Sequence, residues 1–250
     1  MYPVLFDFSI GGSGIYIYSY IFFSVLSVAL ILIFTFISFR RNGLNRPVSL
    51  AGTLVILTFT LIGARLIGVL YKYPFFIEGI DKLISVKYGD FSLFGGLIFA
   101  VLGGFIFARI VRKNVLKIAD ELVFPLGGAL ILWRIGCFLN GCCLGKETDI
   151  WWGVCFDETA GIIVHPTQVY EAGAVIIILS VLLVLGRRIK KPGIFSLVFF
   201  ISFASAYLIV SIFRAHSTYG VILSIILSIV LIGEILLIGV SETRKYKGIK

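Results

Sequence analysis

Long apolar runs separated by short polar connections dominate the chain. Each run holds about 20 residues, the length that a helix needs to cross the hydrocarbon layer of a bilayer. The runs are continuous and lack the strict alternation of a membrane β-barrel wall. The pattern therefore predicts an all-α, polytopic membrane protein with seven transmembrane helices, near Ile15–Phe39, Leu50–Tyr71, Leu93–Val111, Ile118–Leu139, Thr167–Gly186, Gly193–Phe213 and Tyr219–Val240.

Basic residues mark one side of the membrane. Lys and Arg gather after the first, third, fifth and seventh runs, and most acidic residues lie in the connections of the opposite side. Because basic loops stay in the cytoplasm, we expect the N-terminus outside and the C-terminus in the cytoplasm. The two long connections, about 72–92 and 140–166, then lie outside, and residues 1–250 form a single integral membrane domain.

Composition agrees with this class of protein. Hydrophobic residues make up 59% of the chain and charged residues 14%, against roughly 25% charged residues in a soluble domain. The net charge of +9 comes from short clusters between apolar runs, and no basic face is interleaved with aromatic residues. We therefore expect the lipid bilayer as a partner and no nucleic acid.

Four charged residues lie more than one helical turn from either end of an expected span, where each costs about 2.5–3.5 kcal/mol. They are Arg65, Arg134, Glu171 and Glu234. Arg65 follows two small residues, so a helix or a lipid headgroup can come close, and a guanidinium can donate two hydrogen bonds to a carboxylate or a phosphate. Glu234 has no obvious polar neighbour, which favours a helix–helix hydrogen bond.

A polar stripe follows Arg134. If the helix continues, Arg134, Cys137 and Gly141 share one face, with Asn140 beside them in sequence. A positive charge, a thiol and a glycine that permits close approach would then lie together near the outer surface. This pattern favours a functional site over a purely structural role.

The segment His165-Pro166-Thr167-Gln168-Val169-Tyr170-Glu171 opens the fifth expected span. Pro166 suits a helix start, and Gln168 and Glu171 share a face. Glu171 is expected to face the bundle interior and to pair with an in-span arginine. Arg214 and His216 lie in the outer connection after the sixth span, where the arginine can anchor to a headgroup or close over a substrate.

All four cysteines are local to one part of the chain: Cys137, Cys142, Cys143 and Cys155. They can form a disulfide, bind a metal together with His165, or supply a catalytic thiol. Two adjacent cysteines without a Cys-x-x-Cys pair are unlike the standard zinc patterns. We therefore expect no metal and no cofactor.

These segments together resemble the prolipoprotein diacylglyceryl transferase family, in a divergent, cysteine-rich branch. Residues 165–171 look like the family's His-Pro-Ser/Thr-Gln-Leu-Tyr-Glu. Residues 134–141, Arg-Ile-Gly-Cys-Phe-Leu-Asn-Gly, look like its Gly-Arg-x-Gly-Asn-Phe-x-Asn-Gly-Glu block. Weaker likenesses lie at 63–65, 94–98, 119–120 and 213–214, in the same order along nearly the whole chain.

The resemblance implies transfer of a diacylglyceryl group from phosphatidylglycerol to the lipobox cysteine thiol of a prelipoprotein signal peptide, in the bacterial cytoplasmic (inner) membrane. The residues that it suggests for catalysis are Arg134, Arg214, His165 and Glu171. Those suggested for substrate binding are Arg65, Gly95, Gly96, Asn140, Gly141, Gly145, Gln168 and Tyr170. The four cysteines form a possible thiol site.

Three positions depart from the family pattern. Phe94 stands where the family has a His, Cys137 where it has an Asn, and Cys142 where it has a Glu. Because His and Glu suit proton transfer near neutral pH, two alternatives stay open. One is a thiol-dependent membrane enzyme that acts on another lipid-linked acceptor, and the other is a non-catalytic lipid-binding or transport protein.

Overall fold

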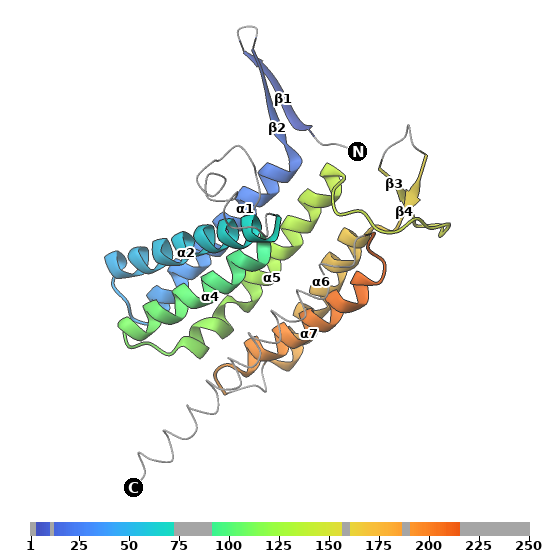
Figure 1. Ribbon diagram of the computed structural model, residues 1–250. Helices are drawn as coiled ribbons and strands as arrows, with labels where there is room; N and C mark the ends of the chain where they lie inside the picture. The colour runs from blue at the N-terminus through green and yellow to red at the C-terminus, as the bar shows by residue number, and fades with distance from the viewer. Residues whose placement is uncertain (1–3, 11–12, 73–91, 157–160, 187–190, 216–250) are drawn as a thin grey trace. The chain divides into compact units, whose positions relative to one another are not determined.

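The computed structural model describes residues 4–10, 13–72, 92–156, 161–186 and 191–215. Its helices are α1 (Ser19–Arg41), α2 (Arg46–Lys72), α4 (Leu93–Ile110), α5 (Val115–Asn140), α6 (Thr167–Leu185) and α7 (Ile194–Ser211), as Figure 1 shows. Two antiparallel strand pairs accompany them, β1 (Val4–Ile10) with β2 (Ser13–Tyr18) and β3 (Val154–Cys155) with β4 (Ile163–Val164).

The structure is that of a mostly helical membrane protein. In the described part of the chain, five helices (α1, α2, α5, α6 and α7) are long and apolar enough to cross a membrane, and α4 is a shorter apolar helix. The second to the sixth expected spans each coincide with a helix to within about one turn. The seventh span, with Glu234, and the neighbouring His216 lie outside the described residues.

The expected start of the first span is wrong. Ile15 lies in β2, and the helix begins only at Ser19. The two strands pair antiparallel from Val4 opposite Tyr18 to Ile10 opposite Ser13. Isoleucine and tyrosine alternate through 15–18, and because all of them are apolar or aromatic, this period of two is hidden in a run that looks continuous.

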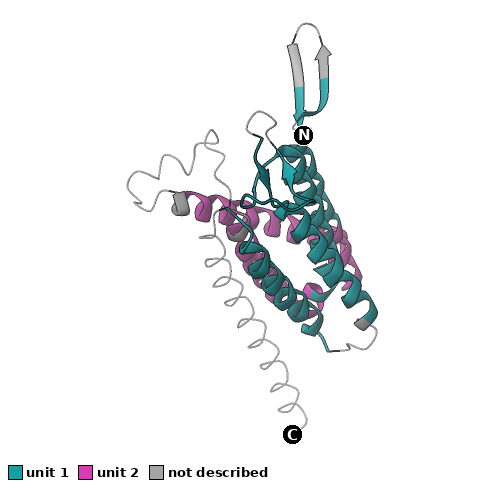
Figure 2. Ribbon diagram, turned by 90° about the vertical axis from the view of Figure 1, so that its right-hand side faces the viewer, with its two compact units in different colours: residues 1–33, 120–250 teal, residues 34–119 magenta. Residues whose placement is uncertain are grey.

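The described residues form two compact units, coloured separately in Figure 2. Unit 1 consists of residues 1–33 and 120–250, and unit 2 consists of residues 34–119. The single membrane domain expected for the whole chain stays a prediction.

Unit 1 has a core between α5, α6 and α7. Its buried hydrophobic residues are Val123, Leu130, Val175, Leu182, Phe199 and Phe203. A Cβ on Gly127 would lie 2.7 Å from Leu179 Cδ1, so this glycine lets α6 pack closely on α5. The Asp120 carboxylate accepts hydrogen bonds from the backbone N–H groups of Gly193 (2.7 Å) and Ser196 (2.8 Å). Asp120 therefore caps the first turn of α7.

Unit 2 is held together by close packing of α2 against α4. A Cβ on Gly95 would lie 2.2 Å from the Gly63 carbonyl oxygen, and one on Gly63 would lie 2.3 Å from Phe99 Cβ. The Ser92 hydroxyl accepts a 3.3 Å hydrogen bond from the Gly95 N–H and caps α4. These contacts explain why small residues occur on both helices.

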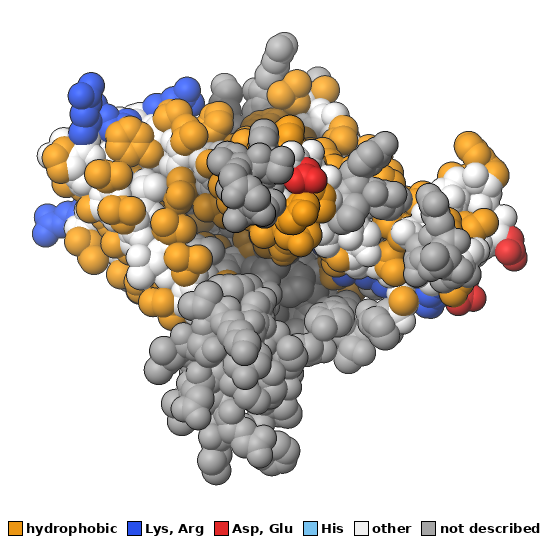
Figure 3. Space-filling model, turned by 90° about the horizontal axis from the view of Figure 1, so that it is seen from above, with side chains coloured by type: hydrophobic (Ala, Val, Ile, Leu, Met, Phe, Trp, Pro, Cys, Tyr) orange, Lys and Arg blue, Asp and Glu red, His pale blue; other side chains and the backbone are white. Residues whose placement is uncertain are grey.

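Apolar side chains cover much of the coloured surface in Figure 3. On the helices, Val25 is 63% exposed, Ile177 65% and Val184 73%. Helices that are apolar on their outer faces as well as in their core contacts suit a lipid environment.

Candidate functional site

Glu171 joins two arginines that come from different parts of unit 1. Its carboxylate forms ion pairs with Arg134 of α5 and with Arg214, which follows α7. The Glu171 side chain is 3% exposed, and the arginine side chains are 11% and 13% exposed. The pairing of Glu171 with an in-span arginine is thereby confirmed. Among the described carboxylates, Glu171 alone pairs with these two arginines, so the buried trio of Arg134, Glu171 and Arg214 carries one more positive charge than negative charge.

Arg214 is held from a second side by α7. Its Nη1 donates a 2.8 Å hydrogen bond to the Tyr207 hydroxyl, and its guanidinium lies 4.9 Å from the centre of the Tyr207 ring. Within the described residues, Arg214 Nε and Gln168 Oε1 are buried without a hydrogen-bond partner. Because a buried donor without an acceptor is costly, Arg214 Nε is a group that a further acceptor would stabilise.

The first turn of α6 anchors the loop that follows α5. The Thr167 hydroxyl donates to the Cys143 carbonyl at 2.9 Å, and the Gln168 side-chain amide donates to the Cys142 carbonyl. Both donor side chains are fully buried. Gln168 therefore fixes the backbone of the cysteine loop, and its expected binding of substrate stays a prediction.

Three chain segments meet at Gly145. Gly145 forms a β-bridge with Arg214, the Lys146 N–H donates to the Phe213 carbonyl at 2.8 Å, and the His165 N–H donates to the Lys146 carbonyl at 3.0 Å. A Cβ on Gly145 would lie 2.3 Å from the His165 carbonyl oxygen. The lack of a side chain at this position therefore allows the backbone contacts that place Arg214.

His165 is oriented by two aromatic residues. Its Nδ1 lies 3.1 Å from the Tyr170 hydroxyl, which accepts a 2.7 Å hydrogen bond from Trp152 Nε1–H. Because a hydroxyl oxygen has two lone pairs, the Tyr170 oxygen can accept from Nδ1–H of His165 as well as from the indole N–H, and Nε2 of the neutral imidazole is then unprotonated. The His165 ring also packs on Phe213, with ring centres 5.0 Å apart.

Three of the cysteines form a cluster beside the arginines. All four cysteines of the chain carry thiols, so the disulfide considered above is not formed. The Sγ atoms of Cys137, Cys142 and Cys143 lie within 4.8 Å of one another. Hydrogen bonds with the other two thiols lower the pKa of Cys143, and the nearby charges of Arg134 and Arg214 lower it further.

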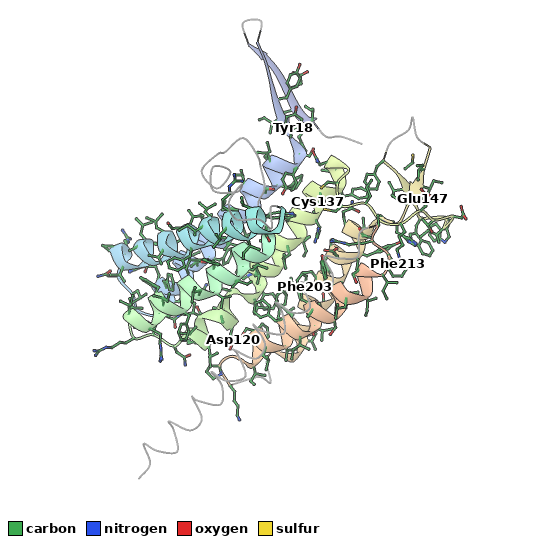
Figure 4. All side chains as sticks on the ribbon, viewed as in Figure 1. Tyr18, Asp120, Cys137, Glu147, Phe203 and Phe213 are labelled. Carbon is green, nitrogen blue, oxygen red and sulfur yellow. The ribbon has the colours of Figure 1, made fainter. Side chains whose placement is uncertain are left out.

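The expected stripe along α5 is only partly right. Arg134 and Cys137 lie on the helix, but α5 ends at Asn140, and Gly141 adopts a left-handed conformation with φ of +70°. Gly141 therefore turns the chain away instead of continuing the face. Figure 4 shows Cys137 toward one end of unit 1 and Asp120 toward the other.

Some expected site residues belong to unit 2, and others were missed. Arg65 lies in α2, and Gly95 and Gly96 lie in α4, so their part in the site stays a prediction. Tyr207 and Trp152 were not expected to hold site residues in place. Tyr207 precedes Arg214 by seven residues, a helical spacing that could have indicated it.

These features define a multi-pass integral membrane protein with a buried, positively charged polar cluster. The family model described as prolipoprotein diacylglyceryl transferase matches residues 3–239, and the chain belongs to this family.

Three relatives carry the name phosphatidylglycerol–prolipoprotein diacylglyceryl transferase. The one from Clostridioides difficile is 30% identical over 62% of this chain and 61% of its own length. The one from Roseobacter denitrificans is 31% identical over 68% and 64%, respectively. The one from Clostridium tetani is 28% identical over 79% of both chains. The chain thus spans less than two thirds of the length of the first two relatives.

Proposed function

We propose that this protein transfers a diacylglyceryl group from phosphatidylglycerol to the lipobox cysteine thiol of a prelipoprotein, forming a thioether. The observation that carries the proposal is the buried cluster of Arg134, Glu171 and Arg214. A phosphodiester has one negative charge, which complements the one positive charge left over in the cluster. Membership of the family and the names of the relatives support the same reaction.

The two arginines suit the change of charge during the reaction. The acceptor sulfur attacks the glyceryl carbon that bears the phosphate, a C–S bond forms, and the C–O bond breaks. Glycerol phosphate leaves with the electron pair, so the phosphate goes from one negative charge to two. Arg134 and Arg214 then bind the transition state more tightly than the lipid, which is the condition for catalysis.

The acceptor thiol must lose its proton, because the thiolate is the nucleophile. We assign this proton to Nε2 of His165, which is unprotonated in the neutral imidazole when Nδ1–H donates to the Tyr170 oxygen. Glu171 suits a positioning role better than a basic one, because each of its carboxylate oxygens faces an arginine.

The proposal includes the topology expected from the sequence: seven spans in the bacterial inner membrane, an outer N-terminus and a cytoplasmic C-terminus. The lipid would enter sideways from the bilayer. In unit 2, a Cβ on Gly43 would lie 3.5 Å from Lys113 Nζ, so the basic α1–α2 and α4–α5 connections lie together. Their proximity supports placing both on one side of the membrane.

A thiol-dependent relative with another lipid-linked acceptor is the second candidate. It is favoured by the thiol cluster, which lies at positions 137 and 142 where the family pattern has other residues. Phosphatidylglycerol would bind the arginines in the same way, and only the acceptor would differ.

One assay separates these functions. The purified protein is placed in vesicles of phosphatidylglycerol labelled in the headgroup glycerol, together with a lipobox peptide, and both released glycerol phosphate and peptide mass are measured. Transfer predicts equal amounts of glycerol phosphate and lipidated peptide. Release that needs a cell extract instead of the peptide indicates another acceptor, and lipid binding without release indicates a non-catalytic protein. A peptide with serine in place of the lipobox cysteine is the control.

A further inference from the structure

The proposed reaction leaves the clustered thiols of Cys137, Cys142 and Cys143 without a role. They come from the last turn of α5 and the residues that directly follow it. Cys137 is 1% exposed, Cys142 is half-buried, and Cys143 is exposed. The cluster therefore has one buried thiol, Cys137, and one exposed thiol, Cys143.

The way in which α5 ends brings the first two thiols together. The Cys142 N–H donates to the Cys137 carbonyl at 3.1 Å, and the Gly141 N–H donates to the Phe138 carbonyl at 3.2 Å. This bond pair, with a left-handed glycine, is the Schellman motif, which places the second residue after the helix over the last turn. Here both residues of that contact are cysteines.

A second backbone turn adds the third thiol. Cys143 has φ of +63°, in the left-handed region that non-glycine residues rarely adopt. The buried Thr167 and Gln168 side chains hold the carbonyls of Cys143 and Cys142 from α6. Neighbouring residues on an extended chain would point apart, whereas here the Cys142 and Cys143 Sγ atoms are 3.9 Å apart. Strain of this kind persists where the surrounding structure maintains it.

We propose that Cys137, Cys142 and Cys143 bind one thiophilic cation, Zn²⁺ or Cu⁺, through their three sulfur atoms. With metal–sulfur bonds of about 2.3 Å and tetrahedral angles, sulfur ligands lie about 3.8 Å apart. The Cys142–Cys143 separation already has this value, and each remaining one needs to shorten by at most about 1 Å. Sulfur ligands select soft cations over Mg²⁺ or Ca²⁺. The exposed Cys143 provides the access route for the ion.

The test is a titration of the full chain with Cd²⁺. The chain is purified in detergent under reducing conditions, and a chelator first removes any bound metal. Cd²⁺ is a spectroscopic probe because its bonds to sulfur absorb in the near ultraviolet. We expect saturation at one ion per chain, with displacement by Zn²⁺ in one arm and by Cu⁺ under anaerobic conditions in a second arm. Cys143→Ser should weaken binding by on the order of a hundredfold or more, since even loss of outer-shell partners costs about 10–100-fold. Cys155→Ser is the matched control and should bind like the wild type.

A second measurement counts protected thiols. Bound Cd²⁺ should shield the three clustered thiols of the wild type from N-ethylmaleimide, as measured by mass spectrometry, and should leave the reactivity of Cys155 unchanged. Cys143 is exposed, so its replacement by serine tests the site without changing the packing around the buried Cys137. Three results would each overturn the proposal. They are a lack of saturable Cd²⁺ binding, equal Cd²⁺ affinity of Cys143→Ser and the wild type, and a disulfide within the cluster of the freshly purified protein.

Discussion

Glu171 and Arg214 lie 43 residues apart in the sequence and form an ion pair in the buried part of unit 1. The backbone places Arg214 through its β-bridge with Gly145, and α7 places it through Tyr207. Glu171 also pairs with Arg134, so one carboxylate sets the spacing of two guanidiniums. A phosphate between two arginines in a fixed arrangement is bound through directed hydrogen bonds as well as charge.

Replacing Glu171 with glutamine should damage both stability and activity. The change leaves two buried arginines without their anion, and an unpaired buried charge costs about 3–5 kcal/mol. We expect a lower unfolding temperature in detergent and at least a tenfold loss of transferase activity. The double variant Glu171→Gln/Arg214→Gln should regain part of the stability and none of the activity. Glu147→Gln, at an exposed residue, is the control, and a Glu171→Gln protein as stable as the control would contradict the account.

Replacing Gly145 with alanine tests the backbone contact beside His165. The added Cβ would lie 2.3 Å from the His165 carbonyl oxygen, and relief of such overpacking costs about 1–3 kcal/mol. Thermal unfolding should therefore shift downward, and the Michaelis constant for phosphatidylglycerol should rise because Arg214 moves. Gly173→Ala in α6 is the control, since no atom of the described residues, apart from the backbone of its own helix, lies within 4 Å of the added Cβ. Equal behaviour of the two variants would refute the contact.

Replacing Gly95 with alanine decides between packing and substrate binding at this position. The new Cβ would lie 2.2 Å from the Gly63 carbonyl oxygen, whereas a Cβ on Gly104 would lie 3.6 Å from its nearest atom, on Ile56. We expect Gly95→Ala to lower the unfolding temperature and Gly104→Ala to leave it nearly unchanged. A Gly95→Ala protein of normal stability with a raised Michaelis constant for phosphatidylglycerol would instead favour direct binding of the lipid.

Removing the imidazole of His165 should affect turnover more than binding. A general base contributes about 10²–10⁴-fold, so His165→Ala should lower kcat by that factor with little change in the Michaelis constant for phosphatidylglycerol. Trp152→Phe removes only the N–H that binds Tyr170 and should cost less than His165→Ala. Trp151→Phe, at a residue that is 90% exposed, is the control. Wild-type turnover by His165→Ala would rule out His165 as the base.

Metal binding at the thiol cluster should stabilise the protein. An ion that binds only the folded state adds about 2.7 kcal/mol at a free concentration of roughly a hundred times Kd. Zn²⁺ should therefore raise the unfolding temperature of the wild type and of Cys155→Ser, and a chelator should reverse the shift. Cys143→Ser should show no shift over the same range. A Zn²⁺ shift of equal size in Cys143→Ser would place the ion elsewhere.

The second to the sixth spans and an arginine partner for Glu171 could be predicted from the sequence because both follow simple physical rules. Continuous apolar runs specify helices by length alone, and a buried carboxylate such as Glu171 requires a cation near it. The sequence left Arg65 and Arg134 as the in-span partners and did not indicate Arg214, which was expected in an outer connection. The backbone pairing at Gly145 and the hydrogen bond to Tyr207 together bring Arg214 to Glu171.

The positions of the cysteines in the sequence did not predict that three of their thiols lie close together. Cys142 and Cys143 are adjacent, which argued against a shared metal ion, but the left-handed backbone of Cys143 and the motif at Gly141 turn the thiols toward each other. The glycine after Asn140 could have indicated the helix end. The conformation of Cys143 has no local sequence signal, because it depends on the carbonyl contact with Thr167.

Release of labelled glycerol phosphate by Arg134→Ala tests whether Arg134 and Arg214 hold the phosphate of phosphatidylglycerol. In vesicles of phosphatidylglycerol with a lipobox peptide, we expect Arg134→Ala to lose nearly all release and Arg134→Lys to recover only part of it. Arg109→Ala, at an exposed arginine, should release glycerol phosphate at the wild-type rate. Full release by a folded Arg134→Ala protein would show that Arg134 does not hold the phosphate.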